Sequence, residues 1–277
     1  MRKGLLFMGA ILLTACLVGC SGQGKSIVPS VPGYDASQKE VIVLGKDLLE
    51  ISGMYYLPNG KIAAINDEEG KIFFIDADDG DFTVSKFGKK RDYEDIAAID
   101  SFFYVLESNG NIHRVPAGVK HVEEEFEFPR EKKIEFESLY HDEPNKRLIL
   151  LSKEQRESRK GILAYSFDPI TLSFSDTPVY TVKWKDIREH LKNNSAEFKP
   201  SAAAIHPLSK KLYVVASIGK ALLIMSPDGH VESAFLLNPD QFPQPEGITF
   251  APNGDMFISN EGVDGKATIL KFPYSQH

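Results

Sequence analysis

Cysteine, tryptophan and long apolar segments are scarce in this chain of 277 residues. Its 2 cysteines, Cys16 and Cys20, both lie near the N-terminus, so the rest of the chain contains no disulfide and must be stabilised by a packed core. The apolar run at residues 4–19 is shorter than the roughly 18 residues expected of a membrane-spanning helix. These shortages exclude a disulfide-rich scaffold and argue against a membrane span in this run.

The sequence also lacks the short motifs of several common enzyme classes. It contains no Gly-x-Ser-x-Gly elbow, no phosphate-binding loop and no dinucleotide fingerprint. Its 7 histidines show none of the paired spacings of zinc sites. The formal net charge of −7 disfavours a nucleic-acid partner and is compatible with cation binding.

The N-terminus has the pattern of a secretory signal. Two basic residues after Met1 precede the apolar run, which ends in small residues before Cys20. Residues 17–20, Leu-Val-Gly-Cys, resemble the lipobox of bacterial lipoproteins, whose cysteine is lipidated and becomes the mature N-terminus. Residues 13–16 also fit, with Cys16 as the modified residue, but the polar segment directly after Cys20 favours Cys20. An ordinary or uncleaved signal peptide is the alternative.

A lipidated Cys20 would anchor the chain to a membrane of the cell envelope without spanning it. Ser21 stands where an aspartate retains some lipoproteins at the inner membrane, so an outer-membrane location, periplasmic or surface-exposed, is favoured. We therefore divide the chain into a signal peptide at residues 1–20, a flexible tether rich in Gly, Ser and Pro at 21–38, and one folded domain at 39–277.

A short phrase with an acidic residue at its head recurs along this domain. Its copies begin at Glu50, Glu94, Glu137 and Glu246, with a degenerate copy at Ser201. The heads are 44, 43, 64 and 45 residues apart (94 − 50, 137 − 94, 201 − 137 and 246 − 201). Units of about 45 residues that each contain several strands are typical of β-propeller blades. The sequence therefore predicts an all-β fold, a five-bladed β-propeller.

Two further features complete this architecture. Residues 184–191 have apolar side chains at helical spacing and no Gly or Pro, so we expect a short inserted helix, which accounts for the interval of 64 residues. The fifth unit has three strands before the chain ends, whereas residues 40–44 form an apolar strand outside any unit. We expect this N-terminal strand to pair as the outer strand of the last blade and to close the ring.

The repeated heads also indicate a site. Because the innermost strand of every blade lines the central channel, the heads should surround one mouth of that channel. We expect metal ligands there at Glu50, Glu94, Glu137 and Glu246. A second tier, at the ends of the second strands, comprises Asp67, Glu68, Glu107, Glu154 and Glu261.

A cation is the simplest explanation of such a ring, because converging carboxylates repel one another. Ca²⁺ accepts about six to eight oxygen ligands in irregular geometry, whereas Mg²⁺ demands a near-ideal octahedron. The alternative for single members of the second tier is a solvated carboxylate in a turn. The sequence therefore predicts Ca²⁺ at the channel mouth.

The phrases are similar to those of the SdiA-regulated family of bacterial envelope proteins. The resemblance extends over residues 41–272 and is carried by residues 50–53 (Glu-Ile-Ser-Gly), 92–96 (Asp-Tyr-Glu-Asp-Ile), 136–139 (Phe-Glu-Ser-Leu), 200–202 (Pro-Ser-Ala) and 245–248 (Pro-Glu-Gly-Ile). It implies a five-bladed propeller with a calcium site and a distant kinship to NHL-repeat propellers, but no established activity. The family's Glu-Gly-Leu or Glu-Gly-Ile phrase is Glu-Asp-Ile and Glu-Ser-Leu in the second and third units, which keeps both glutamates.

Two functions are compatible with these features. The first is a binding module that presents one face of the propeller to a protein, a glycan or a small molecule of the envelope. The second is a metal-dependent hydrolase, lactonase-like or similar to phosphoesterases and phytases, in which the cation activates water. A carboxylate with a raised pKa beside the metal would favour the hydrolase, with Glu68 and Glu154 as candidates, and basic residues such as Lys153 and Arg156 would favour phosphate substrates. The lack of a nucleophile motif favours the binding module.

Overall fold

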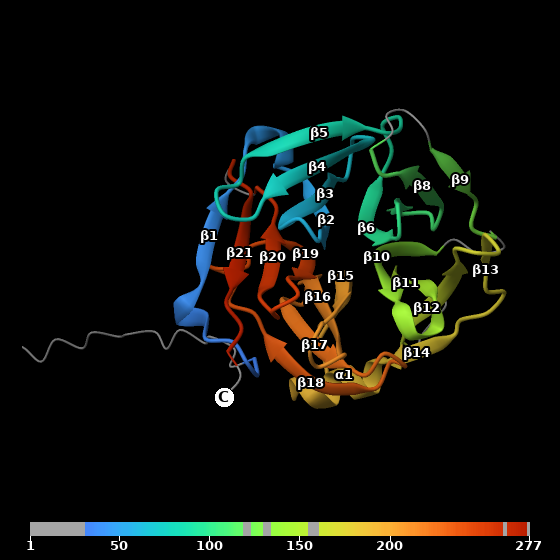
Figure 1. Ribbon diagram of the computed structural model, residues 1–277. Coiled ribbons are helices and arrows are strands. Elements are labelled where there is room, and N and C mark those ends of the chain that lie inside the picture. The colour runs from blue at the N-terminus through green and yellow to red at the C-terminus, as the bar shows by residue number, and fades with distance from the viewer. Residues whose placement is uncertain (1–30, 119–122, 130–133, 155–160, 263–264, 276–277) are drawn as a thin grey trace, which may run out of the picture.

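The computed structural model describes residues 31–118, 123–129, 134–154, 161–262 and 265–275, so Cys16, Cys20 and Arg156 lie outside the described residues. The described chain forms five antiparallel sheets around a central axis, which is a five-bladed β-propeller (Figure 1). The all-β fold class and the number of blades predicted from the repeats are confirmed.

In blades 1, 2 and 4 the strands follow one another along the chain from the axis to the rim. In blade 3 the last two strands both pair with the third, and blade 5 takes its outermost strand from the N-terminal part of the chain. Blade 1 contains β2 (Ile51–Tyr56), β3 (Lys61–Asn66), β4 (Lys71–Asp76) and β5 (Phe82–Lys86). Blade 2 contains β6 (Tyr93–Ile99), β7 (Phe102–Glu107), β8 (Ile112–Pro116) and β9 (Glu124–Phe126). Blade 3 contains β10 (Glu135–Asp142), β11 (Arg147–Glu154), β12 (Gly161–Asp168), β13 (Ser173–Phe174) and β14 (Tyr180–Lys183). Blade 4 contains β15 (Lys199–Ile205), β16 (Leu212–Ile218), β17 (Ala221–Met225) and β18 (Val231–Leu236). Blade 5 contains β19 (Pro245–Phe250), β20 (Met256–Asn260), β21 (Thr268–Phe272) and β1 (Glu40–Val43).

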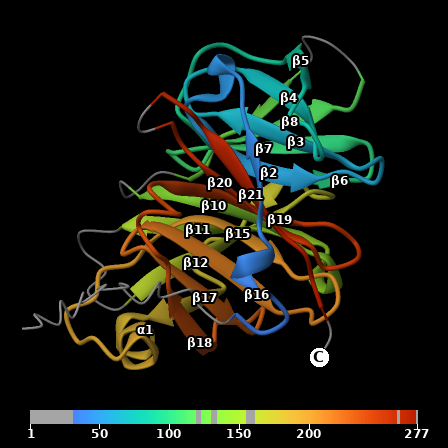
Figure 2. The same ribbon diagram turned by 90° about the vertical axis from the view of Figure 1, so that its left-hand side faces the viewer.

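The N-terminal strand completes the last blade, as the sequence predicted. β1 pairs antiparallel with β21, from Glu40 opposite Lys271 to Val43 opposite Thr268 (Figures 1 and 2). Ile42 faces the core and is 5% exposed, whereas Val43 beside it is 55% exposed. This alternation is that of a strand with one buried face, and it covers the edge that β21 would otherwise leave open.

The innermost strands carry buried side chains at consecutive positions, because both faces of a blade pack against neighbouring blades. Five apolar clusters fill the spaces between the blades, and each cluster combines side chains of two adjacent blades. The ring is therefore held together by burial between blades as well as by the closing strand.

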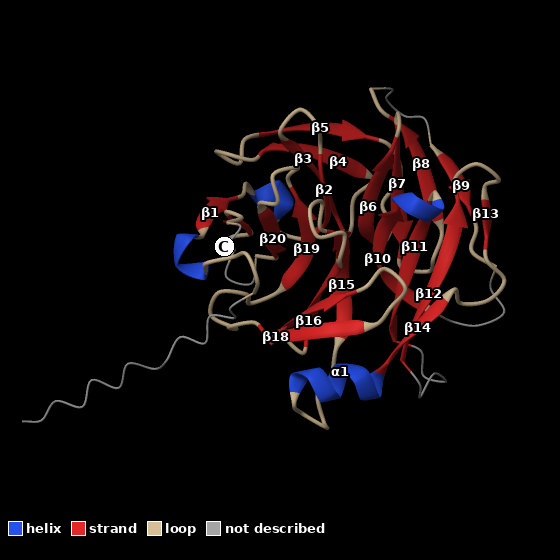
Figure 3. Cartoon of the chain, turned by 60° about the horizontal axis from the view of Figure 1, so that its bottom comes forward, coloured by secondary structure: helices blue, strands red, loops and turns tan. Residues whose placement is uncertain are grey.

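The one α-helix among the described residues is α1 (Trp184–Leu191), which matches the predicted insertion. Its buried Ile187 and Leu191 join the apolar cluster between blades 3 and 4, and Figure 3 shows the helix at the rim beside β18. The short 3-10 helices are η1 (Ala36–Gln38), η2 (Lys46–Leu48) and η3 (Glu143–Asn145). No helix in the described ranges combines the length and the apolar character needed to cross a membrane.

Candidate metal site at the channel mouth

Every innermost strand contains a β-bulge near its N-terminal end. In β6, Tyr93 pairs with Glu107 and Asp95 with Leu106, so Glu94 is the extra residue. The same irregularity makes an extra residue of Glu137 in β10, Ser201 in β15 and Glu246 in β19. A bulge redirects its side chain and bends the strand. The repeated phrase is therefore a repeated bulge that turns its head residue toward the channel mouth.

Blade 1 corrects the sequence alignment of this phrase. In β2 the irregularity lies between Ile51, opposite Asn66, and Met54, opposite Ala64, which leaves Ser52 at the position that Glu94 occupies in blade 2. Glu50 lies outside the strand and is exposed. The expectation that Glu50 is in register with the other head glutamates is therefore wrong. The bulge positions hold three glutamates and two serines, Ser52 and Ser201.

Four of the five bulge residues, all except Ser201, line a cavity of about 360 Å³, which we call the acidic cavity. Seven carboxylates and one ammonium face it, which makes the cavity strongly electronegative. Its lining residues are Ser52, Asp67, Asp92, Glu94, Ser108, Glu135, Glu137, Lys153, Gln244, Glu246 and Glu261.

The inner carboxylates of this cavity hold their protons more tightly than exposed carboxylates do. Burial raises the pKa of Glu94, and the negative charges of Glu137 and Asp92 raise it further. Burial also raises the pKa of Glu137, although the ion pair with Lys153 opposes the shift. The pKa of Glu246 is raised by burial against hydrogen bonds from Ser217 and Ser201. A bound cation would favour the ionised form of these carboxylates and offset the repulsion between them.

Three carboxylates at the rim of the mouth form a close cluster. Oxygens of Glu50, Asp67 and Glu261 lie within 4.8 Å of one another. Burial and the charge of Glu50 raise the pKa of Asp67 to about 6, and burial with the charges of Glu246 and Glu50 raises the pKa of Glu261 to about 8. The buried Oδ1 atom of Asp67 has no hydrogen-bond partner. Three clustered carboxylates, one of which has a buried oxygen without a hydrogen-bond partner, form a suitable ligand set for a hard cation.

The rest of the second tier does not join this site. Glu68 is exposed and lies 4.0 Å from the Lys90 ammonium. Glu107 is turned away from the mouth, because its Oε2 accepts hydrogen bonds from Arg91 at 2.9 Å and contacts His113 at 3.1 Å. Glu107, His113 and Glu125 lie close enough to share a metal, but the Arg91 guanidinium contacts both carboxylates and already supplies the positive charge. The side chain of Glu154 lies outside the described residues.

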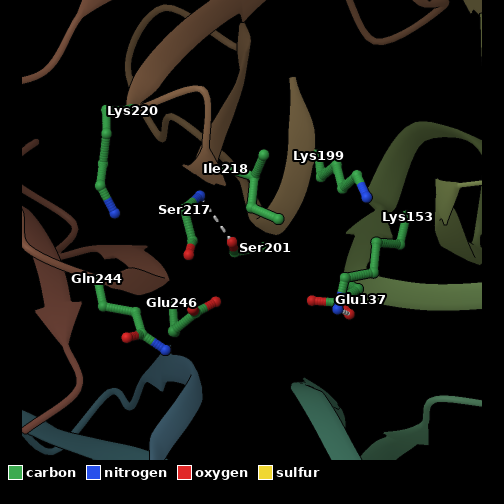
Figure 4. A pocket seen from close by; sticks show the side chains of 9 residues that line it. All are labelled: Glu137, Lys153, Lys199, Ser201, Ser217, Ile218, Lys220, Gln244 and Glu246. Atoms are coloured by element: carbon green, nitrogen blue, oxygen red, sulfur yellow. Dashed lines mark hydrogen bonds and ion pairs between the residues drawn. The ribbon is translucent and has the colours of Figure 1, made fainter. Parts of the chain in front are cut away.

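A second cavity adjoins the acidic cavity and has a different character (Figure 4). It also measures about 360 Å³ and shares Glu137, Lys153, Gln244 and Glu246 with the acidic cavity. We call it the lysine cavity, because Lys199 and Lys220 join Lys153 on its walls, together with Ser201, Ser217 and Ile218. Figure 4 shows Lys220 on one side of this space, Lys153 and Lys199 on the other, and the two serines between them.

Asp95, which follows the bulge in blade 2, is buried within the ring at 2% exposure. Its Oδ1 accepts a hydrogen bond from the backbone N–H of Ile96 at 2.8 Å, and its Oδ2 accepts one from Leu139 in blade 3 at 2.7 Å. Burial raises its pKa well above the usual range, against these bonds and one from Ala203 in blade 4. Asp95 therefore ties three innermost strands together. Gly53 leaves room for it, since a Cβ at Gly53 would lie 2.2 Å from Oδ1.

Comparison with known proteins adds to the evidence for the fold. No model of a known protein family matches the chain, and no curated protein sequence matches it. Among solved structures it is similar to glutaminyl cyclase of Myxococcus xanthus, with 13% identity, 86% of this chain and 96% of that chain covered, and a TM-score of 0.60. It is also similar to regucalcin, a calcium-binding protein of Agrobacterium tumefaciens (12% identity, 82% and 92% covered, TM-score 0.52), and to a luciferin-regenerating enzyme (12%, 84% and 95%, 0.53).

These similarities show the β-propeller fold alone, because the identities are low. Membership of the SdiA-regulated family is not confirmed by them and stays an expectation from the sequence phrases.

Several residues of the two cavities were not predicted from the sequence. Ser52 was not predicted, because the acidic Glu50 was aligned with the other heads of the repeated phrase. The spacing could have identified it, since Ser52 lies 42 residues before Glu94 (94 − 52), close to the next interval of 43 (137 − 94). Asp92, Glu135, Lys199 and Gln244 each lie two residues before a bulge residue, but they share no residue type that would have marked this position as a repeat. Lys220 follows β16 on a loop, so only the fold brings it to the mouth.

Proposed function

We propose that this protein is a ligand-binding module of the cell envelope that holds Ca²⁺ at the mouth of its propeller channel. Two observations on Asp67 carry the proposal: its Oδ1 is buried without a hydrogen-bond partner, and one of its carboxylate oxygens lies within 4.8 Å of carboxylate oxygens of Glu50 and Glu261. The acidic cavity, which Asp67 and Glu261 line, supports it, because seven carboxylates there face one ammonium. The fold shared with calcium-binding regucalcin is compatible with such a site.

The residues divide the binding of the cation between them. Glu50, Asp67 and Glu261 would hold it at the rim, and Glu94, Glu137 and Glu246 would hold or neutralise it from inside. Carboxylates on different blades form an irregular oxygen shell, which suits Ca²⁺ better than Mg²⁺. The cation would supply a positive charge that can polarise a bound oxygen of a ligand.

We further propose that lipidation of Cys20, with Cys16 as the alternative, anchors the domain to a membrane, with the outer membrane favoured. The signal pattern and the polar tether in the sequence support this location. The propeller would then present its mouth to a protein, glycan or small molecule of the envelope. The net charge of −7 supports the expectation that nucleic acid is not a partner.

Ca²⁺ should raise the melting temperature of the EDTA-treated protein, and the rise should grow with pH. The folded-state pKa values of Asp67 and Glu261, about 6 and about 8, lie above the ordinary values of these carboxyl groups, 3.8 and 4.5. The metal-free folded state therefore binds more protons than the unfolded state, and its stability falls as pH rises from about 4 to about 8. Ca²⁺ displaces these protons, so at 100 times its Kd we expect a rise of roughly 5–10 °C at pH 8.5 and little at pH 5.

Matched variants locate the cation in this melting experiment. Asp67→Asn and Glu261→Gln should remove most of the rise, and both should lessen the loss of metal-free stability at high pH. The exposed Glu68→Gln, next in the sequence to Asp67, should behave like the wild type. A melting temperature that is the same with Ca²⁺ and EDTA at every pH would refute the site.

A metal-dependent hydrolase is the second candidate function, and one observation favours it. Glu94 is a half-buried carboxylate with a raised pKa on the wall of the acidic cavity, which suits a general acid or base. A turnover screen with lactones and phosphate esters in Ca²⁺, Mg²⁺, Mn²⁺ and Zn²⁺ tests this function. Turnover that falls by about a hundredfold or more in Glu94→Gln, in a protein whose melting temperature Ca²⁺ still raises, would establish the enzyme over the binding module.

A further inference from the structure

A second group of charged side chains lies in blade 2, around the imidazole of His113 on β8. The side chain of His113 is fully buried, and its ring packs edge to face against Tyr93, with 5.4 Å between the ring centroids. Carboxylate oxygens of three glutamates, at positions 107, 123 and 125, lie close to this ring. A buried imidazole among three carboxylates calls for an account of the charge at each of its two nitrogens.

The Nε2 atom of His113 has its partners. It lies 3.1 Å from Oε2 of Glu107. The Arg91 guanidinium donates to the same oxygen at 2.9 Å and also donates to Glu125 at 2.8 Å. Because a carboxylate that is paired with a guanidinium can only accept hydrogen bonds, Nε2 must carry the hydrogen of the imidazole. In the neutral ring, Nδ1 then presents a lone pair.

The Nδ1 atom faces a carboxylate oxygen of Glu123. The two atoms lie 3.6 Å apart, and both are buried without a hydrogen-bond partner. A proton shared between them would draw them to about 2.7–2.9 Å. The observed separation is instead close to the about 3.4 Å between two ligands of a tetrahedral metal ion with bonds of about 2.1 Å. Two buried lone pairs that face each other at this distance fit a metal ion between them.

The segment that joins blades 1 and 2 leaves room beside these atoms at Gly88. A Cβ atom at Gly88 would lie 2.5 Å from Oε2 of Glu123 and 2.9 Å from the hydroxyl oxygen of Tyr93. Any larger residue would therefore displace the Glu123 carboxylate from its place opposite His113. The side chain of Glu123 is 25% exposed, so an ion can reach the buried nitrogen from the solvent side.

We infer that Nδ1 of His113 and Oε2 of Glu123 bind a divalent transition-metal ion of the zinc type, at a site separate from the proposed Ca²⁺ site. An imidazole nitrogen is a common ligand of Zn²⁺, whereas Ca²⁺ takes oxygen ligands. Glu107 would orient the ring through Nε2, as carboxylates do for the histidine ligands of zinc sites. Water would complete the coordination on the exposed side of Glu123.

The local charge and the sequence are both consistent with this site. Three carboxylates surround the ring, and Arg91 pairs with two of them, Glu107 and Glu125. Glu123 is the third, and a divalent ion would supply its counter-charge. A site with a single histidine shows none of the paired histidine spacings by which zinc sites are found in a sequence.

Calorimetric titration of the whole chain with ZnCl₂ tests this inference. The protein is stripped with EDTA and then kept in saturating Ca²⁺, so that Ca²⁺ occupies the channel mouth. We expect one tightly bound Zn²⁺ per chain. Glu123→Gln should weaken its binding by about a hundredfold, since even groups behind a metal ligand contribute 10–100-fold. Gly88→Ala changes no charge but displaces the Glu123 carboxylate, and should weaken binding about tenfold or more.

Two control variants locate the ion. Glu124→Gln removes the neighbouring carboxylate, which is 55% exposed and pairs with Arg114, and should bind Zn²⁺ like the wild type. Glu261→Gln removes a proposed Ca²⁺ ligand and should also leave the affinity for Zn²⁺ unchanged. Glu123→Gln should keep the rise in melting temperature with Ca²⁺, which shows in addition that this variant folds.

The results that overturn the inference differ from those that overturn the Ca²⁺ site. If Zn²⁺ does not bind, the contact between His113 and Glu123 is an ion pair of a protonated imidazole. If Glu123→Gln binds Zn²⁺ as tightly as the wild type, or Glu261→Gln abolishes the binding, the zinc ion lies elsewhere. Anomalous diffraction at the zinc edge decides the position directly: a peak about 2.1 Å from Nδ1 of His113 supports the site. A peak confined to the carboxylates of the channel mouth refutes it.

Discussion

A variant that lacks residues 1–44 should melt far below a variant that lacks only residues 1–30, or should not fold cooperatively at all. The longer deletion removes β1 together with Tyr34, whose hydroxyl donates to the Gly254 carbonyl at 2.7 Å. It also removes buried side chains of Val31, Ile42 and Leu44. Each such side chain contributes about 1.5–3 kcal/mol, so the free energy of unfolding should fall by roughly 5 kcal/mol or more. This would exhaust much of the stability of an ordinary domain.

Point variants in β1 distinguish loss of closure from a general effect of shortening the chain. Ile42→Ala should lower the free energy of unfolding by about 2–4 kcal/mol, because the removed atoms lie in the core between blades 5 and 1. Val43→Ala, one residue on and 55% exposed, should change it by less than about 0.5 kcal/mol. Urea unfolding measures both. Equal effects of the two variants, or a long deletion as stable as the short one, would show that β1 does not close the ring.

Asp95→Ala should be the most destabilising single substitution at the channel. Its carboxylate accepts backbone hydrogen bonds from Ile96 and from Leu139 in the adjacent blade, at a position with 2% exposure. Removing it leaves these N–H groups buried and unsatisfied, at about 1–3 kcal/mol each. We therefore expect a loss of roughly 3–5 kcal/mol, seen as a fall in melting temperature of about 10 °C or more.

Two controls test the cause of this loss. Asp95→Asn keeps one carbonyl oxygen as an acceptor and should recover about half of the loss. Asp240→Ala removes an exposed aspartate of a turn and should have almost no effect. If Asp95→Ala unfolds at the same urea concentration as Asp240→Ala, the bonds across the blades contribute nothing to stability.

The sequence predicted the blades correctly because blade structure is a local property. Each unit alternates short apolar runs with turn residues, and that pattern holds within about 45 residues. The helix at residues 184–191 could be predicted for the same reason, because the helical spacing of its apolar residues is visible within one short segment. The closing strand at residues 40–43 was found by a different argument: the fifth unit has three strands, and the apolar segment at residues 40–44 belongs to no unit.

The candidate site was only partly predictable, for a physical reason seen at Glu50 and Ser52. A bulge adds one residue to a strand, and the register that defines it depends on the partner strand. Without the partner, the acidic Glu50 looks like the better repeat of Glu94. In the fold, Ser52 takes the bulge position, and Glu50 instead meets Asp67 and Glu261 at the rim.

The sequence by itself determined the five-bladed propeller, its inserted helix, its closing strand and the glutamates at 94, 137 and 246 that face the channel mouth. Only the tertiary structure decided which other charges meet these glutamates. Lys153, Lys199 and Lys220 belong to two blades and share no repeat, yet they line one cavity. Strand patterns repeat because every blade must bury both faces against its neighbours. The charge distribution at the mouth depends instead on side chains from different blades, which come together only when the ring closes.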